Sequence, residues 1–309
     1  MRSMKQLWRM LSDRQFRRQI LRSRGFYSWV SDDRFLKQLY FERMHCTLNL
    51  ENPKSFNEKL QWLKLHDRKP EYTRMVDKCE AKQYVAERIG AEYIIPTLGV
   101  WNRFDEIDFD ELPEQFVLKC THDSGGIVVV RDKRAFDVKQ ARKKISKTLA
   151  RNYYWAGREW PYKDVKPRVL AEQYMQNENE RDLTDYKFYC FNGEPRFLYI
   201  SVGLEDHETA RISFLTCDWQ FAPYERSDYR GFDTLPPKPR NFERMLEIAS
   251  VLSAGIPFLR VDLYEINGQV YFSELTFSPC SGFMPFKTPE HDLEIGEMLA
   301  LPAHEQNRA

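Results

Sequence analysis

The stretch that decides the fold is Phe258–Pro279, which reads FLRVDLYEINGQVYFSELTFSP. Two apolar, aromatic runs flank Asn267-Gly268, a dipeptide that favours a tight hairpin turn. Each run carries one carboxylate, Asp262 in the first and Glu274 in the second. A carboxylate within an apolar strand is unfavourable unless something neutralises it. With the hydroxyl of Thr276, the two acids offer the hard oxygen ligands that Mg²⁺ prefers. The hairpin therefore predicts a metal site.

Whether these residues share a face depends on the turn. A two-residue loop pairs residues whose numbers add to an odd value, which places Asp262 and Glu274 on opposite faces. A three-residue loop, with Gly268 in a left-handed bulge position, shifts the pairing by one. Arg260, Asp262, Glu274 and Thr276 then share one face. We expect the bulge, because only that arrangement assembles a metal site. An ordinary hairpin with solvated acids remains the alternative on these residues alone.

A second segment suited to anion binding is the short apolar strand Phe116–Cys120, which delivers Lys119 into the loop Thr121–Gly126. Glycine lets backbone N–H groups approach an anion, so this loop is a candidate phosphate cradle. It is not a P-loop, because the required Gly-Lys-[Ser/Thr] is missing. We interpret His122 in this loop as a hydrogen-bonding residue rather than a catalyst.

A third segment, Glu172–Met175, follows the apolar run that starts at Arg168. The backbone of such a strand-to-linker edge is able to hydrogen-bond adenine while Met175 packs on the ring. A plain strand end is the alternative reading of the same residues.

Composition sets the class of protein. The chain has 309 residues, of which 42% are hydrophobic and 14% aromatic, enough for a sizeable core and too many for a disordered chain. Lys and Arg (47) nearly balance Asp and Glu (46), so no overall field points to nucleic acid. Six cysteines without a Cys-x-x-Cys pattern predict reduced thiols. No apolar run approaches the roughly 20 residues of a membrane span, and no secretory signal is present. We expect a soluble cytoplasmic protein.

The N-terminus departs from this balance. Met1–Arg24 holds eight Lys or Arg residues against one acid, and Met4, Leu7, Trp8 and Leu11 fall on one stripe at helical spacing. Such a basic amphipathic helix suits peripheral association with an anionic membrane surface. A helix docked on its own domain, with a solvated basic face, is the alternative.

The remaining segments alternate between helical and extended patterns. Capping residues and spacing predict helices from Asn52 onward, over Asp77–Ile89, over Val138–Asn152 and over Asn241–Ala254. Strands are predicted at Leu98–Trp101, Ile127–Val130, Asp185–Phe191 and Pro195–Val202, and residues 203–240 are predicted to be rich in loops.

Taken in order, these segments resemble the ATP-grasp superfamily, and more closely its TupA-like branch, which is associated with teichuronopeptide and surface-polysaccharide synthesis. The resemblance covers about Asn49–Phe283. The strings that carry it are NPKSFNEKLQW at 52–62, Asp77-Lys78, PTLGVW at 96–101, DYKFYCFNG at 185–193 and RVDLYE at 260–265.

The resemblance implies an α+β, ATP-grasp fold in which two α+β subdomains grip ATP between antiparallel sheets. It divides the chain into a helical N-terminal region (1–70), a small α/β segment (71–115), the first grasp subdomain (116–190) and the second (191–309), which contains the metal-binding hairpin.

The resemblance also implies a role for each site residue. Lys78 and Lys119 hold ATP phosphates beneath a flap at Asp123–Gly126, Glu172 and Met175 contact adenine, Asp185 lies near the ribose, and Lys187 lies toward the substrate. Ten residues are implied to bind the nucleotide: Lys78, Lys119, Ser124, Gly125, Gly126, Glu172, Tyr174, Met175, Asp185 and Lys187. Three are implied to be catalytic: Arg260, Lys119 and Lys187. The implied Mg²⁺ ligands are Asp262, Glu274 and Thr276. Thr276 stands where the superfamily usually has Asn, a longer ligand.

The implied activity is an ATP- and Mg²⁺-dependent carboxylate–amine ligase that works through an acylphosphate, on a uronic acid or similar carboxylate and an amino acid or other amine. A phosphotransferase acting on a sugar hydroxyl and a sugar transferase of the same pathway are the alternatives. Six basic residues are candidate anion contacts for such a substrate, or else solvated charges: Arg158, Lys163, Lys166, Arg211, Arg226 and Arg230.

Overall fold

A computed structural model describes residue 8 and residues 11–178, 183–203 and 210–303. The N-terminal region is helical, as predicted, with α2 (Arg14–Ser23), α3 (Asp32–Met44) and α4 (Phe56–His66). Trp8 and Leu11 of the predicted amphipathic stripe are both 73% exposed. The other two members, Met4 and Leu7, lie outside the described residues, so membrane association stays a prediction. Among the described helices, none has both the length and the apolar character to cross a membrane.

Local capping signals explain where two helices begin. The Ser55 hydroxyl accepts a hydrogen bond from the backbone N–H of Glu58, and the Glu58 carboxylate accepts one from the backbone N–H of Ser55, which forms a capping box at the start of α4. The side chain of Asp77 accepts from the backbone N–H groups of Cys79 and Glu80, just ahead of α6 (Glu80–Ile89). The predicted helix over 77–89 is therefore present, but its regular part begins three residues later.

The first sheet is antiparallel and four-stranded. Its strands are β1 (Thr97–Trp101), β2 (Phe116–Cys120), β3 (Ile127–Val130) and β4 (Val169–Gln173), in the order β1-β4-β2-β3. Helix α7 (Val138–Leu149) packs on it through Ala141 and Ile145, both buried in the same apolar cluster as Phe116 and Leu118.

The second sheet is antiparallel and five-stranded. Its strands are β5 (Asp185–Phe191), β6 (Glu194–Val202), β7 (Arg211–Thr216), β8 (Phe258–Ile266) and β9 (Gln269–Thr276), in the order β7-β6-β5-β8-β9. One face packs against α9 (Phe242–Ser253), and the other packs against α4 and α10 (Pro289–Met298). Because both faces are covered, these strands are apolar almost throughout.

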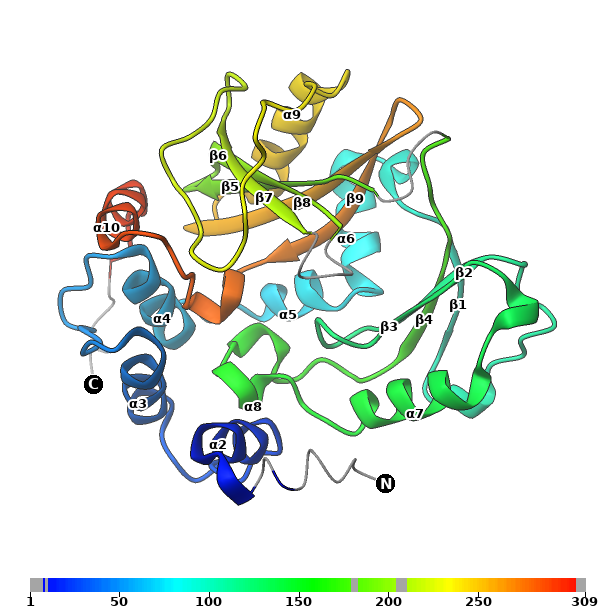
Figure 1. The fold of residues 1–309 in the computed structure, drawn as a ribbon, viewed down its shortest axis with the longest axis horizontal. Helices are drawn as coiled ribbons and strands as arrows, with labels where there is room; N and C mark the ends of the chain where they lie inside the picture. Colours follow the sequence, from blue (N-terminus) through cyan, green and yellow to red (C-terminus); the bar gives the residue numbers. More distant parts are fainter. Residues whose placement is uncertain (1–7, 9–10, 179–182, 204–209, 304–309) are drawn as a thin grey trace.

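Helices α5 (Pro70–Val76) and α6 lie between the two sheets (Figure 1). The shorter helical elements are η1 (Ala91–Tyr93), η2 (Phe104–Glu106), η3 (Lys133–Ala135), α8 (Tyr154–Gly157), η4 (Trp160–Tyr162) and η5 (Pro279–Gly282). The α+β fold class predicted from sequence is confirmed.

The hairpin has the expected strand pairing, but its turn length and the position of its bulge differ from the prediction. Asp262 lies opposite Glu274 and Arg260 opposite Thr276, so these four residues do share a face. The predicted three-residue loop is wrong, however, because Ile266 pairs with Gln269 around a two-residue Asn267-Gly268 turn. Asn267 (φ 50°) and Gly268 (φ 79°) both have the positive φ values that such a turn requires. The register shift is a bulge inside β9, between the pairs Leu263–Phe272 and Asp262–Glu274.

One further element differs from the expectations. Strand β7 forms within residues 203–240, which were predicted to be loop-rich; it is paired to β6 along its whole length. Strand β1 belongs to the four-stranded sheet, and β5, which begins before the predicted boundary at residue 191, belongs to the five-stranded sheet. The division of the chain into domains stays a prediction. Sheet membership follows hydrogen bonding between distant segments, which the order of segments along the chain does not reveal.

Candidate active site

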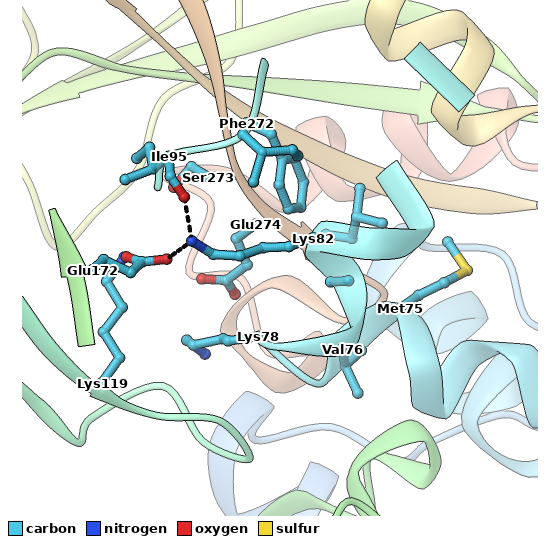
Figure 2. Close-up of a pocket in the computed structure, with 13 residues that line it drawn as sticks. Met75, Val76, Lys78, Lys82, Ile95, Lys119, Glu172, Phe272, Ser273 and Glu274 are labelled. Atoms are coloured by element: carbon cyan, nitrogen blue, oxygen red, sulfur yellow. Dashed lines mark hydrogen bonds and ion pairs between the residues drawn. The ribbon is translucent and has the colours of Figure 1, made fainter. Parts of the chain in front are cut away.

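A pocket lies between the two sheets, closed on one side by the α5–α6 region (Figure 2). Four residues of the predicted site line it: Lys78, Lys119, Glu172 and Glu274. Its other lining residues are Met75, Val76, Ala81, Lys82, Ile94, Ile95, Phe272, Ser273 and Leu275. Strand β2 supplies Lys119, β4 supplies Glu172 and β9 supplies Glu274, so the pocket draws on both sheets.

Glu172 is the centre of charge at the β4 side of the pocket. One carboxylate oxygen lies 2.6 Å from Nζ of Lys82, and the other lies 2.5 Å from Nζ of Lys119. Lys82 also donates to the backbone carbonyl of Ile95 at 2.6 Å, and Figure 2 shows both of its contacts. Burial raises the pKa of Glu172, but the two ammonium groups outweigh it and hold the pKa below its usual value. Glu172 therefore stays ionised and fixes both lysines.

The loop after β2 connects to this pocket through Lys78. Its Nζ donates to the backbone carbonyl of Asp123 at 2.5 Å, while Oδ1 of Asp123 accepts from the N–H of Gly126 at 3.0 Å. Ser124 and Gly125, at the tip of the loop, are exposed. His122 is buried, and its Nε2 contacts the backbone carbonyls of Thr148 (3.2 Å) and Arg151 (3.0 Å), which agrees with a hydrogen-bonding role.

A buried charge network lies on β5, β8 and β9. Arg260 makes two hydrogen bonds of 2.7 Å to Asp262 and one of 2.9 Å to the Thr276 hydroxyl. Lys187 contacts Asp262 at 3.1 Å and Asp185 at 3.0 Å. Burial lowers the pKa of Lys187, but Asp185 and Asp262 outweigh it, so the pKa is raised and the ammonium is kept charged.

Glu274 joins this network to the pocket. Its carboxylate accepts a hydrogen bond from Thr276 Oγ1 at 3.1 Å. Burial raises the pKa of Glu274, but the positive charges of Lys78, Arg260 and Lys187 more than compensate and lower it. An ionised, half-buried carboxylate therefore faces the pocket.

The donor set fits Mg²⁺ only in company with nucleotide phosphates. Among the described residues, no group of three or more His, Cys, Asp or Glu side chains is placed to hold a metal alone. Glu274 offers carboxylate oxygens at the pocket, with the Thr276 hydroxyl hydrogen-bonded to it, and such oxygen donors suit a hard cation. Both oxygens of Asp262 accept hydrogen bonds from Arg260.

The predicted adenine-binding residues lie at the end of β4. The Gln173 N–H donates to the carbonyl of Pro96 at 3.0 Å, and the Tyr174 hydroxyl accepts from Arg131 Nε at 3.2 Å. Tyr174 and Met175 are both half-buried. Their contact with adenine stays a prediction, as do the other nucleotide-binding and catalytic roles.

The six basic residues proposed as anion contacts do not converge. Arg158 is 1% exposed and is held by Asp32 and by the carbonyls of Tyr27 and Val30, so its role is structural. Arg226 is bound by both oxygens of Asp228. The remaining four do not line the pocket: Lys163, Lys166, Arg211 and Arg230.

Sequence analysis missed Lys82. It lies one helical turn beyond Lys78 at the start of α6, and this spacing is the signal that would have placed both side chains toward the same pocket.

Two sheets that enclose a lysine-rich pocket, with a carboxylate on the facing hairpin, define the ATP-grasp class of ATP-dependent ligases. A model of the TupA-like ATP-grasp family matches residues 58–300, and the chain belongs to that family. The suspected family is therefore confirmed.

Similar solved structures are ATP-grasp enzymes at low identity. D-alanine–D-alanine ligase from Bacillus anthracis, solved with ATP, is 13% identical, with 74% of this chain and 68% of that chain covered and a TM-score of 0.38. The enzyme of the same name from Helicobacter pylori is 16% identical, with 80% and 70% covered and a TM-score of 0.41. D-cycloserine synthetase DcsG is 14% identical, with 74% and 70% covered and a TM-score of 0.41. No curated protein matches the chain.

Proposed function

We propose that this protein is a cytoplasmic ligase that joins a carboxylate to an amine at the expense of ATP, through an acylphosphate. The observation that carries the proposal is the convergence of Lys78, Lys82 and Lys119 on one pocket that also contains Glu274. Its three ammonium groups face two carboxylates, Glu172 and Glu274, so the pocket keeps a net positive charge that suits a polyphosphate.

The lysines bind and orient the nucleotide. Glu172 holds Lys82 and Lys119 at fixed positions before ATP arrives, so little reorganisation accompanies binding. Lys78 bridges this pocket to the Asp123–Gly126 loop, which is the natural flap over the phosphates. Closure of that flap excludes water, which would otherwise hydrolyse an acylphosphate.

The hairpin residues act at the transferred phosphoryl group. Glu274, with Asp262 and Thr276 behind it, would hold Mg²⁺ against the phosphate oxygens. The ion, when bound, offsets phosphate charge and orients the γ-phosphate for attack by the substrate carboxylate. Arg260 is fixed by Asp262 and Thr276, and in this proposal its guanidinium neutralises charge on the transferred phosphoryl group.

For the substrate we propose a uronic acid or similar sugar acid, amidated by an amino acid in the synthesis of a surface polysaccharide. The association of the TupA-like branch with surface-polysaccharide synthesis supports this choice.

The test measures ADP release with Mg²⁺-ATP across a panel of sugar acids, each with and without amino acids. We expect ADP only when an acid and an amine are both present, and a loss of at least about 100-fold in Glu274→Ala, because that variant removes the pocket carboxylate. Glu265→Ala, on the same hairpin but outside the pocket, is the control and should retain activity.

Turnover that needs a hydroxyl compound and no amine would instead identify a phosphotransferase. A nucleotide-sugar donor in place of ATP would identify a sugar transferase. Failure to bind ATP at all would contradict the proposal outright.

A further inference from the structure

A second, larger hollow is bounded by α2 and α3, by residues 151–159 and by residues 280–293. Its cavity volume is about 1290 Å³. Small-molecule sites are typically about 300–1,000 Å³, so this groove has room for a substantial substrate.

One carboxylate in the wall of this groove is unusual. Glu159 lines the groove yet is only 5% exposed. The hydroxyl groups of Tyr153 and Ser281 lower the pKa of its carboxyl group. It forms no ion pair within 4 Å with any described cation, although a buried carboxylate normally has one. The nearest ammonium, Lys64, directs its protons instead to Gln61 Oε1 (3.0 Å), Gly157 O (2.8 Å) and Ser281 O (2.7 Å).

The backbone beside Glu159 is strained. Cys280 (φ 51°) and Ser281 (φ 56°) are consecutive non-glycine residues in the left-handed region. Such strain persists where the surrounding structure enforces it, often at functional sites. Here Lys64 and Gln61 enforce it, since they donate to the carbonyls of Ser281 (2.7 Å) and Gly282 (2.6 Å) respectively. The strain presents the Ser281 hydroxyl to Glu159.

Tyr153 joins the groove to the flap and to the ATP pocket. It lines the groove together with Glu159, and its hydroxyl accepts a hydrogen bond from Ser124 Oγ of the flap at 3.3 Å. Tyr153 also packs against the buried cluster of Val76, Tyr162 and Val165, and Val76 lines the ATP pocket, so this end of the groove meets that pocket.

We propose that the groove admits the amine substrate and that Glu159 accepts the proton which this amine loses before it attacks the acylphosphate. This inference rests on the ligase function proposed above and assigns the amine side of that reaction.

The step balances as follows. An alkylammonium gives one proton to the Glu159 carboxylate and becomes a neutral amine with a free electron pair. That pair forms the C–N bond at the acyl carbon, and the C–O bond to phosphate breaks, so that its electrons leave on phosphate. The second nitrogen proton departs with the phosphate, and Glu159 returns its own proton to solvent through the groove.

The electrostatic surroundings suit a base. Burial raises the pKa of Glu159 above its usual value; Lys64, Ser281 and Tyr153 oppose this rise, and Glu274 adds to it. The titratable groups that act on it are Lys64 from α4, Tyr153 before α8, Tyr162 of η4 and Glu274 of β9. A carboxylate with a raised pKa is a stronger proton acceptor near neutral pH.

The experiment compares two nucleophiles in Glu159→Gln, with the carboxylate that the ADP-release panel identifies. Hydroxylamine is uncharged at neutral pH and needs no base, whereas an amino acid arrives as an ammonium. We expect amide formation to fall by about 100-fold or more, with hydroxamate formation within about threefold of the parent protein. The amide rate of the parent should rise with pH through the titration of Glu159, and Glu159→Gln should lose that limb. Glu225→Gln, an exposed acid outside both sites, is the matched control.

Equal losses with both nucleophiles, in a variant that still binds Mg²⁺-ATP, would overturn the assignment, as would an undiminished amide rate. If Glu159→Gln does not fold, Tyr153→Phe serves as the test variant. It removes the hydrogen bond between Ser124 and Tyr153 and should slow amide formation but not hydroxamate formation. Absence of hydroxamate in the parent protein with every carboxylate would count against the ligase function itself.

Discussion

Glu172 shows how one side chain sets the charge of the nucleotide pocket. It is 5% exposed and holds Lys82 and Lys119 on its two oxygens. Removal of its charge leaves two ammonium groups facing each other across a buried site. Breaking a buried ion pair costs about 3–5 kcal/mol.

We therefore expect Glu172→Gln to lose about 3 kcal/mol of unfolding free energy at pH 7 and to raise KM for ATP. The pKa of Glu172 is lowered in the folded state, so its contribution is present above the usual pKa and is lost as pH falls through the lowered value. Urea unfolding between pH 3 and 7 checks this: the difference between parent and variant should shrink toward acid. Glu80→Gln, in a more exposed pair with Arg168, should change stability by less than about 1 kcal/mol. A pH-independent difference would contradict the charge argument.

At the scale of elements, the β2–β3 connection depends on the absence of a side chain at one position. A Cβ atom on Gly126 would lie 2.6 Å from Sγ of Cys120 and 2.9 Å from Cγ2 of Thr148. On Gly125 it would meet nothing nearer than Asp123 Oδ2 at 4.0 Å. The two glycines are neighbours in the sequence, but only at Gly126 would a side chain clash with its surroundings.

Gly126→Ala should destabilise the protein by about 1–3 kcal/mol, because the new methyl group overpacks α7 against β2. It should also raise KM for ATP, since the displaced loop carries the Asp123 carbonyl that binds Lys78. Gly125→Ala should leave both quantities close to those of the parent protein. Thermal unfolding and ADP-release kinetics on the two variants provide the comparison, and equal behaviour of the pair would refute it.

At the scale of the whole molecule, one carboxylate gathers several of the contacts that hold the N-terminal helices to the ATP-grasp body. Asp32, at the start of α3, accepts from Arg68 at 2.7 Å and from Tyr154 at 2.6 Å, and lies 3.4 Å from Arg158. Arg158 is 1% exposed and also packs against the rings of Phe35 and Trp155.

Asp32→Ala leaves the buried Arg158 guanidinium without its carboxylate, and we expect a loss of about 3–5 kcal/mol. Asp33→Ala, at the exposed neighbouring position, should cost no more than about 1 kcal/mol. Chemical unfolding measures both. Comparable losses in the two variants would show that Asp32 does not carry this junction. Because α2 and α3 also bound the groove, Asp32→Ala should weaken amine use more than ATP binding.

The sequence by itself determined the elements and much of the chemistry. Most strands and helices were predicted from patterns among residues that are close in the sequence. Examples are alternating apolar residues, the Asn267-Gly268 turn and the Ser55–Glu58 cap. The quoted motifs identified the family, and Lys78, Lys119, Glu172 and Glu274 do line one pocket.

Only the tertiary structure decided what depends on distant contacts. It placed the bulge within β9 rather than at the turn, paired β7 to β6, and brought Lys82 to Glu172 across 90 positions of the chain. It also showed that the Asp262 carboxylate is held by Arg260, and that Glu159 lies buried between a strained turn and a groove. Hydrogen-bond register and the convergence of charges arise from pairing between segments far apart, and no local pattern of residues encodes them.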